Sequence, residues 1–179
     1  MRKSITINGD TLKRIYSHAV ESYPNECCGI ITGKTADADV QAGQKAQTGH
    51  VGMQAGKEQE QTVHPCRNIQ DELHASDPVK YPRTARVAYA MNRDEAEEIF
   101  KSAKRSGESV VAFYHSHPEH DAYFSEEDKE AQTVFGEPEF PEALQVVISV
   151  KLGMINGIKY FRWNGSSGDF EEAGDSTDA

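Results

Sequence analysis

The chain has 179 residues, a formal net charge of −10 at pH 7 and three cysteines. An acidic protein repels the phosphates of nucleic acids, so we expect no nucleic-acid partner. No apolar run approaches the ~18 residues of a membrane span, and the start, MRKSITINGD, has no apolar stretch typical of a signal peptide. We therefore expect no membrane partner. Three cysteines make no even disulfide framework, so we expect a cytoplasmic protein. The length suits one domain with its own core.

The first part of the chain predicts a helix and then a buried strand. Apolar residues recur at spacings of three and four over residues 10–24, which predicts a helix capped by Asp10 and ended by Pro24. Residues 27–34, CCGIITGK, form a short apolar run that indicates a buried strand. Residues 35–61 have almost no large apolar side chains, so we interpret them as a flexible polar insertion at the surface.

The next stretch has weaker patterns. Residues 62–69 are typical of a strand, and residues 70–83, with two prolines, predict a loop with at most one helical turn. Residues 84–91 predict a half-buried strand, because apolar side chains alternate at Ala85, Val87, Tyr89 and Met91.

A second helix is predicted over residues 92–107. Asn92 is its expected N-cap, with Glu95 three residues on as in a capping box, and Gly107 closes it. The continuous apolar run that follows, residues 109–117, favours a central strand of a sheet. A third helix is expected over residues 125–135.

The last part of the chain predicts a Pro-broken loop at 136–142 and two strands, 143–150 and 157–163. The strands form an expected antiparallel pair around an Asn156-Gly157 turn. We expect residues 165–179 to be a disordered acidic tail. The predicted fold is therefore one α/β domain over residues 1–164, with a mixed β-sheet flanked by helices.

One stretch, FYHSHPEHDAYFSEED at 113–128, points to chemistry. His115 and His117 lie two apart on a strand and therefore face the same side. Ser125 begins a helix, and Asp128 lies in its first turn. Two imidazoles and a carboxylate are the three-ligand set of a catalytic zinc site, with a fourth position left for water. The alternative interpretation is structural, because S-x-x-D is also a capping box at a helix start.

This stretch resembles the JAMM, or MPN-plus, metalloprotease motif, which is His-x-His-Pro, six residues, Ser, two residues and Asp. The family also carries an upstream glutamate, often within Pro-x-Glu-x-Cys-Gly, and here YPNECCGIITG has Glu26 in that place. The resemblance covers roughly residues 5–163 and is closest in size to the prokaryotic stand-alone members. It implies a single MPN domain, whose core is similar to that of cytidine deaminases.

The resemblance also implies the roles of the residues and the reaction. His115, His117 and Asp128 would bind one zinc ion per chain, Glu26 would be the general base and then the proton donor, and Ser125 would hydrogen-bond the oxyanion. The implied reaction is hydrolysis of the peptide or isopeptide bond after the C-terminal Gly-Gly of a ubiquitin-like modifier or sulfur-carrier protein. Segments 67–86 and 136–142 are the expected walls of the cleft. The sequence leaves the particular modifier and the oligomeric state open.

Two alternatives stay open at this point. One is a non-catalytic MPN binding scaffold, although such scaffolds typically lack the His pair or the Asp. The other is a zinc hydrolase of a small amide substrate on a related deaminase-like core. A deaminase would show Pro-Cys-x-x-Cys, and Pro65-Cys66 has only its first half.

The remaining candidates have simpler interpretations. We expect His120 to be an exposed residue at the rim of the site. The cysteines are expected to be small apolar fillers, and the other histidines structural or solvated. These residues are Cys27, Cys28, Cys66, His18, His50, His64 and His74.

Overall fold

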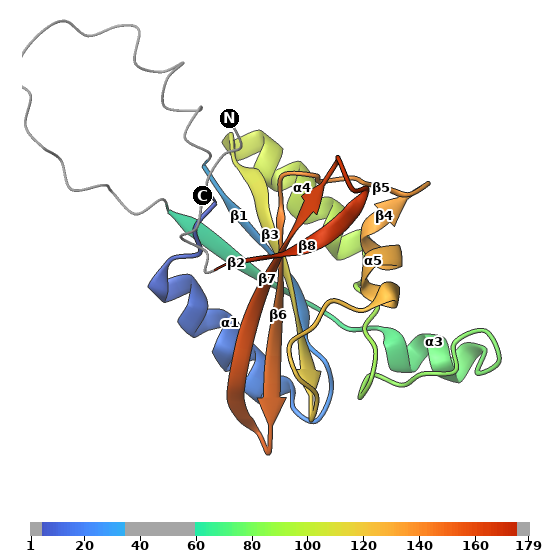
Figure 1. Ribbon diagram of the computed structural model, residues 1–179. Coiled ribbons are helices and arrows are strands. Elements are labelled where there is room, and N and C mark those ends of the chain that lie inside the picture. Colours follow the sequence, from blue (N-terminus) through green and yellow to red (C-terminus); the bar gives the residue numbers. More distant parts are fainter. Residues whose placement is uncertain (1–4, 35–59, 175–179) are drawn as a thin grey trace, which may run out of the picture.

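The computed structural model describes residues 5–34 and 60–174, in which a six-stranded mixed sheet is flanked by four helices (Figure 1). Across the sheet, the strands are β2 (Gln61–Cys66), β1 (Cys28–Gly33), β3 (Ser109–Pro118), β6 (Leu144–Lys151), β7 (Met154–Asn164) and β8 (Asp169–Ala173). Only the β3–β6 pair is parallel, and the four other pairs of this sheet are antiparallel. The predicted α/β class with a mixed sheet is confirmed.

The helices cover both faces of the sheet. Helix α1 (Gly9–Ser22) packs one face, where Ile15 and Ala19 are buried in the larger core. Helix α4 (Arg93–Ser106) packs a second core that includes Phe113 of β3. Figure 1 shows α3 (Gln70–Ser76) projecting beyond the sheet, and α5 (Glu126–Gln132) follows β3 in the chain. The described residues contain no helix long and apolar enough to cross a membrane.

Strand β3 lies at the centre of the sheet, between β1 and β6, as its apolar sequence predicts. Because successive side chains of a strand point to opposite faces, Ala112 and Tyr114 join the core under α1. Phe113, His115 and His117 therefore point to the opposite face. The two histidines thus face away from α1, at the end of a strand that is buried over residues 111–118.

The N-cap predicted for α4 is confirmed, and the one predicted for α1 is wrong. Asn92 caps α4, accepting the Glu95 N–H at 3.0 Å, and Gly107 ends this helix at a φ of 71°. The Glu95 carboxylate accepts the Arg67 N–H at 2.9 Å, and the Asn92 N–H donates to the Arg67 carbonyl at 3.1 Å, so the expected capping box with Glu95 is wrong. The expected cap of α1 is wrong, because Asn8 and not Asp10 accepts the Thr11 N–H.

The segment 84–91 is not a strand, contrary to its alternating pattern. Its ladder contact is a single bridge between Met91 and Asn68, and Val87 is 47% exposed. Instead of a ladder, its main chain bonds to the Asp71 and Asn68 side chains and, at Ala85 and Ala90, to the main chain of Glu26 and Ile69. The preceding segment contains the two-turn helix α3 rather than at most one turn.

Two hairpins also differ from their sequence patterns. The third helix ends at Gln132, and β4 (Thr133–Val134) turns into β5 (Glu137–Pro138) where a longer helix and a loop were expected. The β6–β7 turn lies at Leu152-Gly153, where φ is 51° and 72°. Two positive φ values fit a tight hairpin turn, which leaves Asn156-Gly157 inside β7.

The prediction of a disordered tail from residue 165 and of a domain end at 164 is wrong. Residues Asp169–Ala173 form β8 at the edge of the sheet, antiparallel to β7. Phe170 is buried against Phe124 and Trp163, and this apolar contact holds an otherwise acidic segment on the sheet. Residues 175–179 and nearly all of the expected insertion, residues 35–59, lie outside the described residues.

Candidate metal centre

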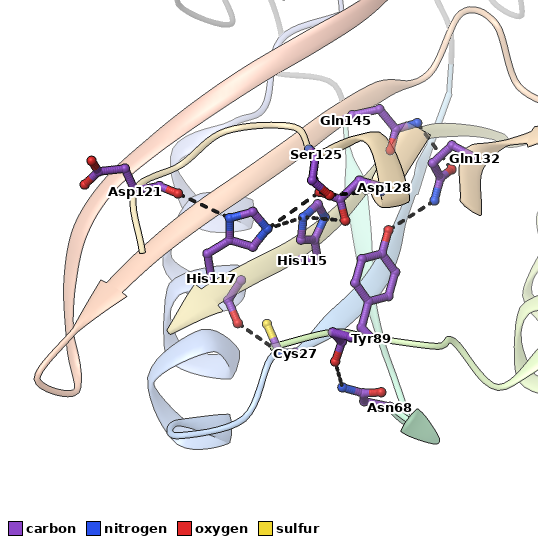
Figure 2. Close-up of polar contacts among 12 residues, drawn as sticks. Cys27, Asn68, Tyr89, His115, His117, Asp121, Ser125, Asp128, Gln132 and Gln145 are labelled. Carbon is purple, nitrogen blue, oxygen red and sulfur yellow. Dashed lines mark hydrogen bonds and ion pairs between the residues drawn. The ribbon is translucent and has the colours of Figure 1, made fainter. Parts of the chain in front are cut away.

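His115 and His117 lie at the end of β3, where neighbouring strands hold the main chain on both sides. His115 is opposite Cys28 of β1 and Val147 of β6, and His117 is opposite Ser149. Both imidazoles are buried. Figure 2 shows the two rings pointing toward Asp128. The sheet therefore presents two imidazoles on one face with little freedom of position.

Asp128 reaches the histidines because the loop after β3 is anchored to the sheet. The Ser149 hydroxyl donates to the His120 carbonyl at 2.6 Å, and Phe124 is buried against Phe161 and Phe170. These contacts bring the start of α5 over the end of β3. Asp128, in the first turn of this helix, is itself buried.

The distances within this trio fit one metal ion. His115 Nε2 lies 3.1 Å from His117 Nε2 and 3.4 Å from Asp128 Oδ1, and His117 Nε2 lies 3.7 Å from Asp128 Oδ2. Ligands bound tetrahedrally to zinc at 2.0–2.2 Å stand about 3.3–3.6 Å from one another. The three side chains, whose ligand atoms all lie within 4.8 Å of one another, could therefore hold a zinc ion.

The main chain orients one of these imidazoles. His117 Nδ1 lies 3.2 Å from the Asp121 carbonyl oxygen, which can only accept a hydrogen bond (Figure 2). Nδ1 therefore carries the proton, and the Nε2 lone pair faces the trio. A main-chain partner of this kind is common for histidines that bind metals.

The trio is also coupled electrostatically. Burial opposes the charge of Asp128, but hydrogen bonds with His115, His117 and Ser125 hold the pKa of its carboxyl well below its usual range. Burial lowers the pKa of His115 despite the nearby carboxylate. For His117 burial is outweighed by Asp128 and Glu26, which raise its pKa. Asp128 therefore stays ionised, as a metal ligand must.

Ser125 forms the capping box that its spacing predicts. Its hydroxyl accepts the Asp128 N–H at 3.1 Å and donates to Asp128 Oδ2 at 2.6 Å, while its own N–H donates to the same oxygen at 2.8 Å. The structural interpretation of this pair is therefore confirmed. The capping box fixes the orientation of the carboxylate toward the two histidines.

Glu26 lies in the same cleft although it is far from the trio in sequence. Its neighbour Cys27 donates its N–H to the buried Ser116 hydroxyl at 2.9 Å and accepts the Ser116 N–H at 3.1 Å. Ser116 lies between the two histidines, and its bonds to Cys27 thus place the segment before β1, which includes Glu26, beside them. Glu26 is 7% exposed and lines a cleft of about 300 Å³ with His117 and Asp128.

The surroundings of Glu26 disfavour its charge. Burial, and to a lesser degree the Asp128 carboxylate, raise the pKa of Glu26 to about 8, against the opposing effects of His117 and Arg83. A carboxyl group with a pKa near neutrality can both take and return a proton at physiological pH.

The walls of the cleft differ in part from those expected. Arg83 and residues 87–89 form one wall, and Tyr123 with residues of α5 forms the other. Arg83 spans the cleft to Glu127, with 2.5 Å between nitrogen and oxygen. Of the two expected walls, 67–86 supplies Arg83, whereas 136–142 is wrong, because its residues 139–142 line a separate groove beside Phe100.

The secondary candidates take the expected places. His120 is exposed at the rim of the cleft, and the three cysteines are buried free thiols. His18, His64 and His74 hydrogen-bond Tyr114, Thr32 and the Tyr81 carbonyl respectively, as structural histidines do. His50 lies outside the described residues.

Two residues around the site were not identified from the sequence. Tyr89 stacks on His115, with 4.6 Å between ring centroids, and its hydroxyl accepts a hydrogen bond from Gln132 Nε2 at 3.4 Å. Asn68 bonds to the main chain of Glu26 and of the segment around Tyr89. No sequence spacing predicts that either residue lies near the site, because both reach it through contacts between segments that are distant in the sequence.

Comparison with known proteins agrees with this geometry. The family described as prokaryotic homologs of the JAB domain matches residues 9–157. The chain belongs to this family.

The proteins similar to the chain include one curated relative and two solved structures. A protein named desampylase, from Haloferax volcanii, is 29% identical over 130 residues, which is 70% of each chain. The solution structure of a protein from Desulfitobacterium hafniense has a TM-score of 0.58 at 20% identity, covering 94% of this chain and 89% of the other. One from Salinibacter ruber has a TM-score of 0.54 at 20% identity, covering 96% and 90%. These two structures show a shared fold.

Proposed function

We propose that this protein is a zinc-dependent peptidase or isopeptidase. Its reaction is hydrolysis of the amide bond after the C-terminal Gly-Gly of a ubiquitin-like modifier or a sulfur-carrier protein. The observation that carries the proposal is the buried trio of His115, His117 and Asp128, with the Glu26 carboxyl in the same cleft. Membership of the JAB-domain family and the similarity to a protein named desampylase support a ubiquitin-like substrate.

The trio would hold one zinc ion per chain through His115 Nε2, His117 Nε2 and an Asp128 oxygen. Zinc in such a site supplies a bound water with a pKa lowered to about 7 and polarises the carbonyl of the substrate. The donor set of two imidazoles and a carboxylate suits this metal, because it is a ligand set of catalytic zinc sites and would leave one coordination position for water.

The protein's own residues move the protons. Glu26 takes a proton from the attacking water and returns it to the leaving amine, for which its raised pKa is suited. Ser125 turns its hydroxyl proton from Asp128 toward the substrate oxygen as negative charge develops there. Asp128 and the Asp121 carbonyl keep the two imidazoles in position throughout.

The test combines metal analysis with hydrolysis. Purified protein should contain one zinc per chain and should cleave a fusion joined through the Gly-Gly end of a ubiquitin-like protein. A fusion ending in Ala-Ala is the matched substrate control and should resist cleavage. Bound zinc without cleavage of any fusion would favour a non-catalytic binding scaffold. Cleavage of small amides alone would favour a zinc hydrolase of a small amide substrate.

A further inference from the structure

Asn68 occupies a junction between three segments of the chain. It lies between the end of β2 and the start of α3, and its main chain bridges Met91 just before α4. The residue is half-buried and is not among those that line the cleft. Its side chain must therefore act on the site through other residues.

The side-chain amide of Asn68 makes four hydrogen bonds. Its Nδ2 donates to the carbonyls of Glu26 at 3.0 Å and Ala88 at 3.2 Å. Its Oδ1 accepts the N–H groups of Gln70 and Ala90, both at 3.0 Å. An asparagine amide has two donor hydrogens and two acceptor lone pairs, so this set uses its full capacity and allows only one orientation of the amide.

The partners of Asn68 belong to two groups on which the proposed reaction depends. The first is the main chain of Glu26, whose N–H in addition donates a hydrogen bond to the Ala85 carbonyl at 2.7 Å. The second is the pair Ala88 and Ala90, which lie on either side of Tyr89. One side chain thus holds the residue that carries the carboxyl group and the residue that stacks on His115.

The far end of Tyr89 is held as well. Its hydroxyl accepts from Gln132 of α5, and Gln132 Oε1 accepts from the buried Gln145 of β6 at 3.3 Å (Figure 2). Tyr89 is therefore fixed at its main chain by Asn68 and at its hydroxyl by Gln132. Since it stacks at an interplanar angle of 26°, it limits rotation of the His115 ring.

We propose that Asn68 is a positioning residue, which holds the main chain of Glu26 and the Tyr89 ring against His115 in one geometry. The inference rests on the proposed function. Residues that orient metal ligands and catalytic groups typically contribute about 10–100-fold to metal affinity or activity. Asn68 acts in this way without touching the metal or the substrate.

The experiment compares Asn68→Ala and Asn68→Asp with the wild-type chain. Asn68→Asp keeps the shape and an acceptor for Ala90 but replaces the two N–H donors, so that a carboxylate faces the carbonyls of Glu26 and Ala88. In zinc-loaded protein we expect kcat on the Gly-Gly fusion to fall about 10–100-fold in both variants while KM stays within about threefold. Chelator competition should show weaker zinc binding in both.

A second readout needs neither metal nor activity. In chelator-treated protein, amide hydrogen exchange at Glu26 should become faster in both variants, and exchange at Ala90 should become faster in Asn68→Ala. The matched control is Asn8→Ala, which removes a helix cap on the other face of the sheet. It should leave kcat and the exchange of Glu26 and Ala90 unchanged.

The outcomes separate this inference from the proposed function. A kcat within threefold of wild type in Asn68→Asp, with unchanged exchange at Glu26, overturns the inference. If Asn68→Ala does not fold, Asn68→Asp decides alone. If the wild-type protein hydrolyses no fusion, the proposed function fails, and the exchange measurements still decide whether Asn68 holds Glu26.

Discussion

Two buried carboxyl groups, Glu26 and Asp128, lie in the same cleft, and their surroundings move their pKa values in opposite directions. Asp128 receives hydrogen bonds from the histidines and from Ser125, which stabilise its charge. Glu26 is desolvated and lies near the negative charge of Asp128, which disfavours its own charge. Opposite environments of this kind distinguish a carboxylate that binds a metal from one that transfers protons.

Replacing Glu26 by glutamine tests this division. Glu26→Gln keeps the size of the side chain but removes its ability to take a proton. We expect zinc content to stay at one per chain and hydrolysis to fall about 10²–10⁴-fold, the usual contribution of a general base. Metal analysis and initial rates measure the two quantities. Activity equal to the wild type would exclude Glu26 as the base.

The raised pKa of Glu26 also predicts how stability depends on pH in chelator-treated protein. Between its unfolded pKa of 4.5 and its folded pKa of about 8, the folded state binds a proton that the unfolded state has lost. The free energy of unfolding therefore decreases as pH rises through this window, by up to about 1.4 kcal/mol per pH unit from this group.

The measurement is urea unfolding at pH 5, 6.5 and 8, with Glu26→Gln as the comparison. Because the two chains share every other titrating group, the difference between their unfolding free energies isolates Glu26. Glutamine has no charge to desolvate, so the variant should gain stability relative to wild type as pH rises. A difference that does not change with pH would show that Glu26 is not desolvated in the folded state.

At the scale of elements, Phe170 is the one fully buried residue of the edge strand β8. Phe170 is buried against Phe124 and Trp163, while its neighbour Glu172 is exposed and pairs with Lys159 at 2.7 Å. Phe124 belongs to the loop that brings α5 and Asp128 to the histidines. The edge of the sheet is thereby connected to the candidate metal centre.

Phe170→Ala should therefore destabilise the protein by about 3 kcal/mol, the lower end for truncating a buried phenylalanine. Glu172→Ala, two residues away on the same strand, should change stability by no more than about 0.5 kcal/mol, since exposed ion pairs contribute little. Thermal or urea unfolding of both variants measures this. Equal effects of the two substitutions would show that β8 does not pack as described.

The elements also show where sequence patterns fail. The alternation in residues 84–91 matches a strand, yet the main chain of Ala88 and Ala90 bonds to the Asn68 side chain and not to a neighbouring strand. Asn156-Gly157 is a strong turn signal, but the hairpin turns at Leu152-Gly153 and leaves that pair within β7. In both cases pairing between distant segments overrides a local preference.

At the scale of the whole molecule, metal binding and folding should be linked. The proposed ligands come from β3 and α5, so they come together only in the folded chain. Zinc then binds the folded state in preference, and free zinc at 100 times Kd should stabilise the protein by about 2.7 kcal/mol.

Thermal unfolding at increasing zinc concentrations tests this linkage. The Tm of the wild type should rise with zinc, while His115→Ala should show little zinc-dependent change. His120→Ala is the matched control, because this histidine is exposed at the rim, and its Tm should follow that of the wild type. A loss of the zinc effect in His120→Ala, or its absence in the wild type, would contradict the proposed ligand set.

The sequence by itself determined the fold class and the set of candidate site residues, His115, His117, Ser125, Asp128 and Glu26. The two-residue repeat of a strand and the capping pattern of a helix start point to His115, His117, Ser125 and Asp128. Glu26 is identified by the resemblance to the JAMM motif, and no local spacing predicts it. Only the tertiary structure decided that Glu26 lies beside the histidines through Ser116, and that Asn68 and Tyr89 surround them. Those contacts join segments that are distant in the sequence, and local periodicity does not predict which main-chain groups form hydrogen bonds with one another.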